Sequence, residues 1–441
     1  MRRTITAAIA ACIVVAAVPS AAPAQLLGVL TVERLSILDE PWAGARAYGM
    51  GGAYTAVSDD ALGILYNPAG IALAGQNEVS VGLYQRWQDI EHIYDGYPSS
   101  TSTSDLSFGH VGAVFPYSSY TTDLYFGFGV FRTGGSDLEY VREGDRPDLG
   151  GTVRNVLLQS GSVYQYRFAI AGALTRAVSV GAAFVLWDGN PRFIEKISFS
   201  GPADSSYVFS DDVSANLDGF SFDFGIHARL GRFVDAGLVV TTPAWLDYGG
   251  NGVERYDGTW PDGAGWTTDP YDFRVRDEIT LPMTLRGGAA FVTEPLTLSA
   301  EATWADYTQT KFDGMKLYYE DDPTVDVLKQ VWSYRVGAEL RVPQTTLSLR
   351  AGYAYQPLPV RGIDEMTYIE ETPDEFWLVT DWQFCNVSNE RRFYTFGAGV
   401  VIDEALSIDA AMTFGSFERR TLYLTETRDI TELVVSGSFR F

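Results

Sequence analysis

The stretch LTLSAEATWADYTQT, residues 296–310, alternates apolar and polar side chains along most of its length. In a strand, one face would carry Leu296, Leu298, Ala300, Ala302 and Trp304, and the other Thr297, Ser299, Glu301 and Thr303. Residues 331–342 and 346–357 repeat this period of two, with arginine on the polar face. A soluble β-sandwich also alternates, but it seldom exposes Leu, Trp and Tyr opposite charged residues in so many strands. The pattern therefore predicts transmembrane strands whose apolar face meets lipid.

Segments of this kind recur along the chain and predict an all-β fold, an antiparallel transmembrane β-barrel of about fourteen strands. The connections alternate between short ones of about two to five residues and long ones of about twelve or more, as expected for periplasmic turns and extracellular loops. The predicted strands are 78–88, 105–116, 122–132, 162–174, 178–188, 217–230, 234–246, 278–292, 296–310, 331–342, 346–357, 392–402, 405–417 and 430–441, of which 234–246 alternates poorly.

The N-terminus predicts export. Arg2 and Arg3 precede an apolar run at 5–18, and an Ala-x-Ala site ends at Ala24, so residues 1–24 are expected to be a signal peptide. The apolar run is shorter than the roughly 20 residues of a spanning helix. Residues 78–441 are assigned to the barrel, and residues 25–77 remain outside its wall.

The segment 25–77 contains YNPAGIALAG at 66–75, in which Asn67-Pro68 is a turn signal. A barrel of about fourteen strands has a lumen too wide to be filled by its own side chains, since roughly eight strands is the limit. We therefore expect residues 25–77 to form an N-terminal hatch that plugs the lumen from the periplasmic side. Gly49, Gly51 and Gly52 are expected to permit tight turns and a close approach to the wall.

Composition excludes several functions. A formal net charge of −24 disfavours nucleic acid as a partner. Cys385 is the only cysteine outside the signal peptide, so neither an internal disulfide nor a thiolate metal site is expected, and no metal or cofactor is predicted. Asp223, His227 and Arg229 would share one inward face, but no nucleophile can be assigned to them, so the chain is not expected to be an enzyme.

The chain ends in LVVSGSFRF, residues 433–441, an alternating strand that finishes on Phe441. A terminal phenylalanine on such a strand, together with a signal peptide, resembles the assembly signal of bacterial outer-membrane proteins. This resemblance implies recognition by the barrel-assembly machinery and a place in the bacterial outer membrane, among lipid and lipopolysaccharide. A monomer is expected.

Residues 45–72, ARAYGMGGAYTAVSDDALGILYNPAGIA, resemble the N-terminal hatch of the FadL/TodX family of outer-membrane transporters for long-chain fatty acids and other hydrophobic compounds. Asn67, Pro68 and Ala69 match the family's hatch signature, and 281–307, 332–360 and 396–415 look like its later strands. The resemblance implies passive uptake of a hydrophobic small molecule. The ligand would bind the extracellular loops, move to a pocket beside the hatch, and leave laterally through the wall as the hatch shifts.

The wording GMGGAYTAVSDDA is also similar to relatives of this fold that serve as shuttles in type IX protein secretion. A shuttle or binding barrel of that kind, or a structural outer-membrane protein with long acidic loops, is the alternative to a transporter. A shuttle would have a sealed lumen and a rim that binds protein, whereas a transporter would have a continuous apolar path.

Two sets of residues are candidates for ligand contacts. Inward arginines, in particular Arg167, Arg286, Arg335 and Arg350, would favour an anionic head group, unless they pair with inward acids or with hatch acids such as Asp59 and Asp60. In the long loop 358–391, Tyr368, Phe376, Trp377 and Trp382 alternate with acids and would form a capture groove. The alternative for that loop is an acidic, solvated surface bridged to lipopolysaccharide by divalent cations.

Overall fold

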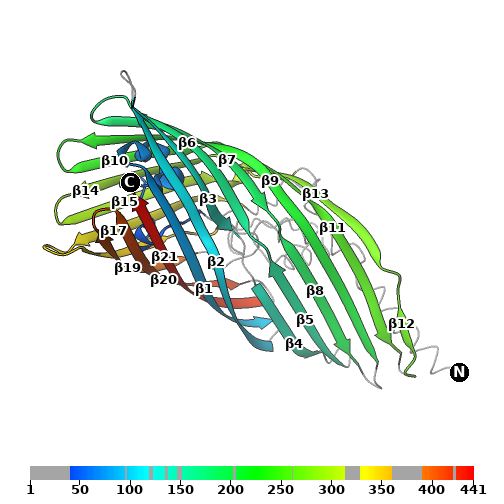
Figure 1. The fold of residues 1–441 in the computed structure, drawn as a ribbon. Coiled ribbons are helices and arrows are strands. Elements are labelled where there is room, and N and C mark those ends of the chain that lie inside the picture. Colours follow the sequence, from blue (N-terminus) through cyan, green and yellow to red (C-terminus); the bar gives the residue numbers. More distant parts are fainter. Residues whose placement is uncertain are drawn as a thin grey trace.

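The computed structural model describes residues 40–94, 97–118, 123–134, 138–146, 151–201, 205–260, 262–312, 328–359, 390–420 and 424–441. Within these ranges the strands form one closed antiparallel barrel (Figure 1). Its wall contains fourteen membrane crossings. The predicted fold class is therefore confirmed. Among the described residues, no helix is both long and apolar enough to cross a membrane.

The sheet has 21 strands, because breaks divide several of the fourteen crossings. The strands are β1 (Glu78–Tyr94), β2 (Tyr97–Ser118), β3 (Asp123–Gly134), β4 (Leu138–Arg146), β5 (Gly151–Ser160), β6 (Val163–Ala173), β7 (Val178–Gly189), β8 (Arg192–Ser200), β9 (Ser206–Leu230), β10 (Val234–Thr241), β11 (Ala244–Thr259), β12 (Gly265–Thr267), β13 (Tyr271–Leu281), β14 (Thr284–Val292), β15 (Leu296–Asp306), β16 (Lys311–Phe312), β17 (Gln330–Arg341), β18 (Leu347–Tyr355), β19 (Arg392–Ile402), β20 (Leu406–Arg420) and β21 (Leu424–Arg440). The helices are α3 (Ala45–Gly49), α4 (Gly63–Tyr66), η1 (Pro68–Leu73) and η3 (Tyr307–Gln309).

The first and last strands close the barrel. β1 pairs with β21 from Glu78↔Arg440 to Tyr94↔Leu424, and the amide of Phe441 donates to the carbonyl of Asn77 at 3.0 Å. Closure leaves the C-terminus at the end with the short turns, where α3 and α4 also lie (Figure 1). By the convention of outer-membrane barrels this end is periplasmic.

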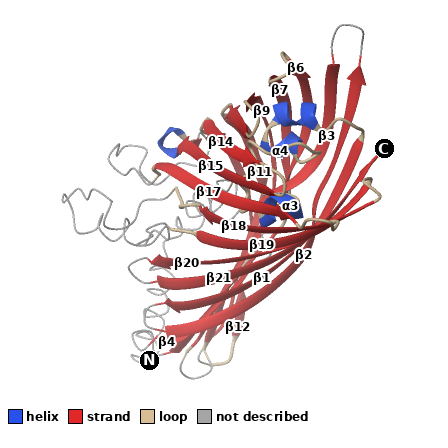
Figure 2. Ribbon diagram, turned by 90° about the vertical axis from the view of Figure 1, so that its left-hand side faces the viewer, coloured by secondary structure: helices blue, strands red, loops and turns tan. Residues whose placement is uncertain are grey.

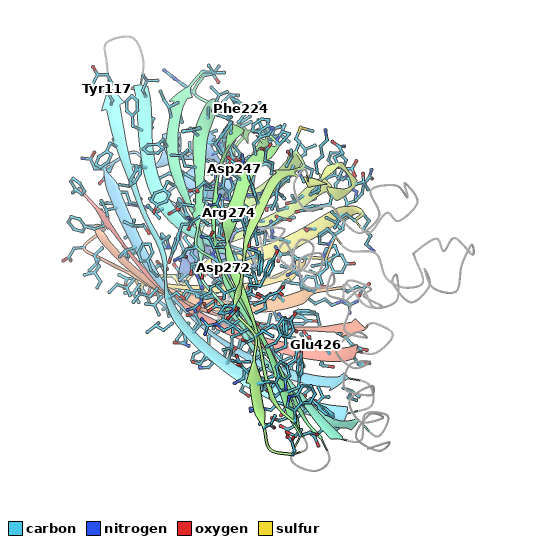
Figure 3. The ribbon with its side chains drawn as sticks, turned by 90° about the vertical axis from the view of Figure 1, so that its right-hand side faces the viewer. Tyr117, Phe224, Asp247, Asp272, Arg274 and Glu426 are labelled. Carbon is cyan, nitrogen blue, oxygen red and sulfur yellow. The ribbon has the colours of Figure 1, made fainter. Side chains whose placement is uncertain are left out.

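Alternation along the strands separates a lipid-facing belt from the lumen, as β9 illustrates. Phe220, Phe222, Phe224 and Ile226 are exposed on the outer face, while the intervening Asp223 is buried on the inner face. The same division holds around the wall, because a period of two sends successive side chains to opposite faces. Phe224 marks the belt in Figure 3, with Asp247, Arg274 and Asp272 beyond it toward the extracellular end.

Several predicted loops are in fact strands. The sequence predicts loops at 89–104, 133–161, 189–216 and 247–277, but β1 and β2 pair up to Tyr94↔Tyr97, and β4, β5, β8, β9, β11, β12 and β13 continue the sheet beyond the belt. We call this part the extracellular extension. Its outer face meets water rather than lipid, so the strong apolar alternation that identified the membrane strands is missing there.

Two predicted strands, 234–246 and 278–292, are each broken. The first divides into β10 and β11 at Pro243, and the second into β13 and β14 at Pro282. Proline has no amide to donate to a ladder. Inward residues are odd-numbered in β10 and even-numbered in β11, so the alternation changes phase at the break. This phase change explains why 234–246 alternates poorly.

Candidate functional site

The described N-terminal residues 40–77, here called the lumenal segment, lie inside the barrel. Its three short helices are enclosed by the wall, with α3 near β18 and β19 and α4 near β3 (Figure 2). Met50, Tyr54, Ile64, Leu65 and Tyr66 are fully buried, together with inward wall residues such as Phe131 and Ala169. The predicted signal peptide, 1–24, and the start of the predicted hatch lie outside the described residues. The boundaries 25–77 and 78–441 stay predictions.

The Asn67-Pro68-Ala69 turn binds both the lumenal segment and the wall. Asn67 is extended, at φ −159° and ψ 105°, as expected before proline. Its Nδ2 donates to the carbonyl of Thr55 at 3.0 Å and to that of Ile226 in β9 at 3.1 Å, and its Oδ1 accepts from the amide of Ala69 at 3.1 Å. One buried side chain therefore joins two parts of the lumenal segment to the wall.

Glycines in the wall allow this turn to approach. A Cβ at Gly181 of β7 would lie 2.5 Å from the carbonyl carbon of Pro68, and one at Gly225 of β9 would overlap Oδ1 of Asn67. These glycines are cross-strand neighbours. We call them the Gly181–Gly225 window.

A second such window lies on another part of the wall, where Gly337 of β17 pairs with Gly352 of β18. A Cβ at Gly352 would overlap Gly51, and one at Gly337 would overlap Met50. Gly51 has a φ of +63°, and the carbonyl of the nearby Gly49 accepts from Oγ1 of Thr395 at 3.2 Å. Gly52, at φ +74°, continues the turn. The glycines predicted for tight turns thus lie where the lumenal segment contacts the wall.

Buried ion pairs form a second set of links. Arg335 donates to Glu301 at 2.7 Å and also pairs with Glu40 of the lumenal segment. The other carboxylate oxygen of Glu301 accepts the amides of Tyr54 and Thr55 at 3.2 and 2.9 Å. A single wall carboxylate thereby fixes the turn that also receives the Asn67 hydrogen bond.

A neighbouring network centres on Glu339. Arg350 donates to Glu339 at 2.7 Å and to Asp409 at 2.6 Å, and Arg46 of the lumenal segment donates to Glu339 at 3.1 Å. Arg46 also pairs with Asp59. Charges this deeply buried must be paired to be tolerated.

The two remaining candidate arginines are also engaged. Arg167 pairs with Asp223 and reaches the carbonyl of Ile64 at 3.4 Å. Arg286 lies 3.9 Å from Glu301 and donates to the carbonyl of Tyr66 at 3.4 Å. All four predicted head-group arginines are therefore in ion pairs, and Arg335 pairs directly with Glu40 of the lumenal segment, which favours the pairing alternative. Contact of any of them with a ligand head group stays a prediction.

In the extracellular half of the barrel, inward apolar residues form one buried cluster. Its members come from β6, β8, β9, β11, β13, β15, η3 and β17, and we call it the apolar stripe. Its members are Val163, Phe193, Val213, Ala215, Leu217, Ala244, Leu246, Tyr248, Val275, Ile279, Leu281, Ala305, Tyr307 and Val331. A water-filled porin has a polar lumen, so this surface suits a hydrophobic solute.

A cavity of about 140 Å³ lies beside the lumenal segment, bordered by Trp42, Tyr48 and Tyr84 and by inward residues of β1, β2, β19 and β21. It reaches Gly109 and Gly134, where the wall is irregular. The β2–β3 ladder ends at His110↔Phe131, and within the described ranges no ladder joins β2 to β4 above it. The cavity therefore borders a break in the hydrogen-bonded ladder, which the ion pair of Arg132 in β3 with Asp105 in β2, at 3.0 Å, spans.

A larger cavity, of about 580 Å³, opens at the periplasmic end and has a mixed lining. Arg46, Asp60, Glu339 and Arg350 line it, together with residues of the β17–β18 and β19–β20 turns. Because its lining is already occupied by the ion-pair network, it has the character of a hydrated vestibule rather than a site for a hydrophobe.

The remaining predicted site residues provide no evidence for a ligand, catalytic or metal site. Tyr368, Phe376, Trp377 and Trp382 lie outside the described residues. His227 contacts the carbonyl of Ala56 at 3.1 Å, and Asp223 is held by Arg167, so both serve packing. In the described ranges, no group of three or more His, Cys, Asp or Glu is placed to hold a metal ion.

Residues of the extracellular extension were missed at the sequence level. Asp211 and Glu254 are cross-strand neighbours on the inner face, next to Phe209 and Tyr256. They fall in segments predicted as loops. Odd-numbered apolar residues at 207, 209, 213 and 217 were the signal that could have revealed them.

Solved structures share this fold. A FadL homologue from Pseudomonas aeruginosa superposes with a TM-score of 0.64 over 91% of this chain and 99% of its own, at 14% identity. The toluene transporter TodX from P. putida gives 0.64 over 91% and 99% at 17% identity, and the toluene transporter TbuX from Ralstonia pickettii gives 0.57 over 92% and 100% at 15% identity. No protein-family model and no curated protein matches the chain.

Proposed function

We propose that this chain, which has the fold of the FadL homologue and of the toluene transporters TodX and TbuX, is a passive channel of the bacterial outer membrane that takes up hydrophobic small molecules. The observation that carries the proposal is the apolar stripe. It begins in the extracellular extension, and its members Ala305, Tyr307 and Val331 lie beside Glu40 of the lumenal segment. A structural barrel has no use for such a lining, and a hydrophilic pore would be obstructed by it.

The cavity beside the lumenal segment is the proposed binding site that the ligand reaches after the apolar stripe. An engineered apolar cavity of roughly 150 Å³ holds benzene, and the cavity here measures about 140 Å³. By volume, one aromatic ring fits against Trp42, Tyr48 and Tyr84, beside a polar part of the lining formed by Arg86, Arg428 and Glu432, whereas a long acyl chain requires the lumenal segment to move. We infer that compounds with a single ring are the better candidates in this conformation.

The proposed exit is lateral, at the discontinuity between β2 and β3–β4. Gly109 and Gly134 border both the cavity and the end of the β2–β3 ladder, so a ligand in the cavity would leave there once the Arg132–Asp105 ion pair opens. Lateral release delivers a hydrophobe to lipid rather than to water. The lumenal segment would act as the hatch, with Asn67, Pro68 and Ala69 at its fixed corner.

The test is uptake of toluene by cells that produce the chain and lack other channels for hydrophobes. Val275, an inward member of the apolar stripe, is replaced by Asp, and Val253, on the outer face of β11, receives the same substitution as the control. We expect Val275→Asp to reduce uptake about tenfold, because a charge in the stripe must be desolvated around the solute, and Val253→Asp to leave it unchanged. Equal uptake by wild type, both variants and cells without the chain would reject the proposal.

A protein retained on purification, with no toluene uptake, would favour the secretion-shuttle alternative.

A further inference from the structure

Three carboxylates form one row on the inner face of the extracellular extension. Glu195 of β8 lies opposite Asp211 of β9, and Asp211 lies opposite Glu254 of β11. Asp211 shares its face of β9 with Val213 and Leu217 of the apolar stripe. Directly opposed residues have Cβ atoms about 5 Å apart, and like charges in such pairs destabilise the sheet. A proton or a positive charge at the central Asp211 would relieve this repulsion.

Asp211 supplies an independent sign of a ligand. Its side chain is only 5% exposed, and its Oδ1 has no hydrogen-bond partner in the described part of the protein. An ionised oxygen that is buried and unpartnered is costly unless a cation or donor reaches it.

Asp211 lies outside the membrane, roughly 30 Å along β9 from Phe220, where the lipid-facing belt ends, at about 3.3 Å per residue. Burial, reinforced by repulsion from Glu254 and Glu195, raises the pKa of Asp211 to about 7. The facing titratable groups are Glu195 on β8 and Glu254 and Tyr256 on β11.

Aromatic rings border the carboxylate row. Toward the extracellular tip, the rings of Phe209 and Tyr256 are 5.0 Å apart, and Tyr207 lies 6.2 Å from Tyr256 and 6.1 Å from Trp266. Toward the lumenal segment, the ring of Phe273 covers Gly252. Faces of Trp, Tyr and Phe attract cations, above all organic ones.

A metal ion fits this site poorly. In the described ranges no cluster of three or more His, Cys, Asp or Glu is placed to hold a metal ion. Calcium requires six to eight oxygen ligands. An organic cation needs only proximity to carboxylates and aromatic faces. The candidate arginines Arg167, Arg335 and Arg350 are already paired with acids, so they give an anionic head group no special advantage.

We propose that Glu195, Asp211 and Glu254, with the aromatic rings around them, bind the positively charged nitrogen of a hydrophobic amine or quaternary ammonium compound as it enters the apolar stripe. The inference rests on the proposed function and names the substrate class that the extracellular end selects. A neutral hydrophobe follows the same stripe without this added attraction.

Phenyltrimethylammonium and its neutral isostere tert-butylbenzene differ in charge but hardly in shape, which makes them matched probes. Their dissociation constants are measured on the purified full-length chain in detergent, by calorimetry or by the fluorescence of tryptophans such as Trp266. We expect the cation to bind at least about tenfold tighter. Asp211→Asn should remove most of that preference and leave the isostere unaffected.

The control variant is Asp218→Asn, since Asp218 lies on the outer face of the same strand. It should bind both probes as the wild type does. Glu254→Gln is the second test of the row, in case Asp211→Asn fails to fold. Because the cation needs ionised Asp211, its affinity should rise roughly tenfold between pH 6 and pH 8, while the isostere shows no change.

Equal affinities for the two probes, or a cation preference that survives both Asp211→Asn and Glu254→Gln, would overturn the cation site. So would displacement of phenyltrimethylammonium by micromolar calcium, which would identify a metal site instead. In these cases uptake of toluene still tests the channel separately. Loss of toluene uptake together with binding of neither probe would reject both.

Discussion

Asn67 shows how much one side chain can do in this lumen. It satisfies two carbonyls and one amide, and these groups belong to the Thr55 turn, to β9 and to the start of η1. Pro68 holds Asn67 extended, and from this backbone its amide group reaches both the Thr55 turn and the wall. The sequence predicts this local geometry, because it depends on the order Asn-Pro alone.

Replacing Asn67 by Ala should loosen the lumenal segment. The carbonyls of Thr55 and Ile226 would lose their donor, and each buried group left unsatisfied costs about 1–3 kcal/mol. We expect lower resistance of the segment to urea and increased leakage of antibiotics too large for the closed barrel. Gln76→Ala, at an exposed site of the same segment, is the control. Unaltered leakage and urea resistance in Asn67→Ala would count against a fixed corner at this turn.

At the scale of elements, the strands that contact the lumenal segment do so through glycine. In β7 and β9, Gly181 and Gly225 admit the Pro68 turn, and in β17 and β18, Gly337 and Gly352 admit Met50 and Gly51. A strand otherwise has little reason to place glycine in its interior, where it packs poorly. These positions identify the strands that hold the segment.

The Gly181–Gly225 window can be closed by one substitution. A side chain in Gly181→Val would collide with the backbone of Pro68 and Ala69, which are buried, so the turn must move. We expect a barrel that still folds but leaks, with greater proteolysis of the lumenal segment. Gly287→Val is the matched control, since a Cβ there meets only Leu238, at 3.9 Å. If both variants stay equally tight to solutes, the window has no part in closing the lumen.

The sequence did not predict where several strands break or end. Alternation located the membrane crossings, but it failed wherever the phase changes, as at Pro243, or the outer face turns polar, as beyond Asp218. The alternation arises because the outer face of a membrane strand must be apolar where it contacts lipid. Beyond the lipid the outer face is polar, so paired strands there show no apolar alternation in the sequence.

For the whole molecule, the lumenal segment fills the barrel. A barrel with fourteen crossings cannot be filled by its own side chains, and here the interior is occupied by residues 40–77, of which Tyr54, Tyr66 and Met50 are fully buried. The ion pairs Arg335–Glu40 and Arg46–Glu339 fasten the lumenal segment to the wall. Under the proposed function we expect a barrel that blocks ions and passes hydrophobes along the apolar stripe.

Planar-bilayer conductance checks this arrangement. The full-length chain should carry almost no steady ionic current, whereas a chain lacking residues 40–77 should carry a large one, because water and ions then fill the lumen. Adding toluene to the full-length chain should leave the current near zero, since lateral exit does not open an aqueous path. A large resting current in the full-length chain would contradict a closed lumen.

The sequence by itself determined the class of fold, the number of crossings and the turn at Asn67-Pro68, because each follows from local periodicity or from a dipeptide. It also placed arginines and acids on inward faces, but left open whether they meet each other or a ligand. Only strand pairing and the entry of the lumenal segment into the barrel decided that. The segment brings Glu40 to Arg335, which pairs across neighbouring strands with Glu301, and strand register sets Asp211 between Glu195 and Glu254. Cross-strand register is a long-range property, so these contacts appear only in the folded barrel.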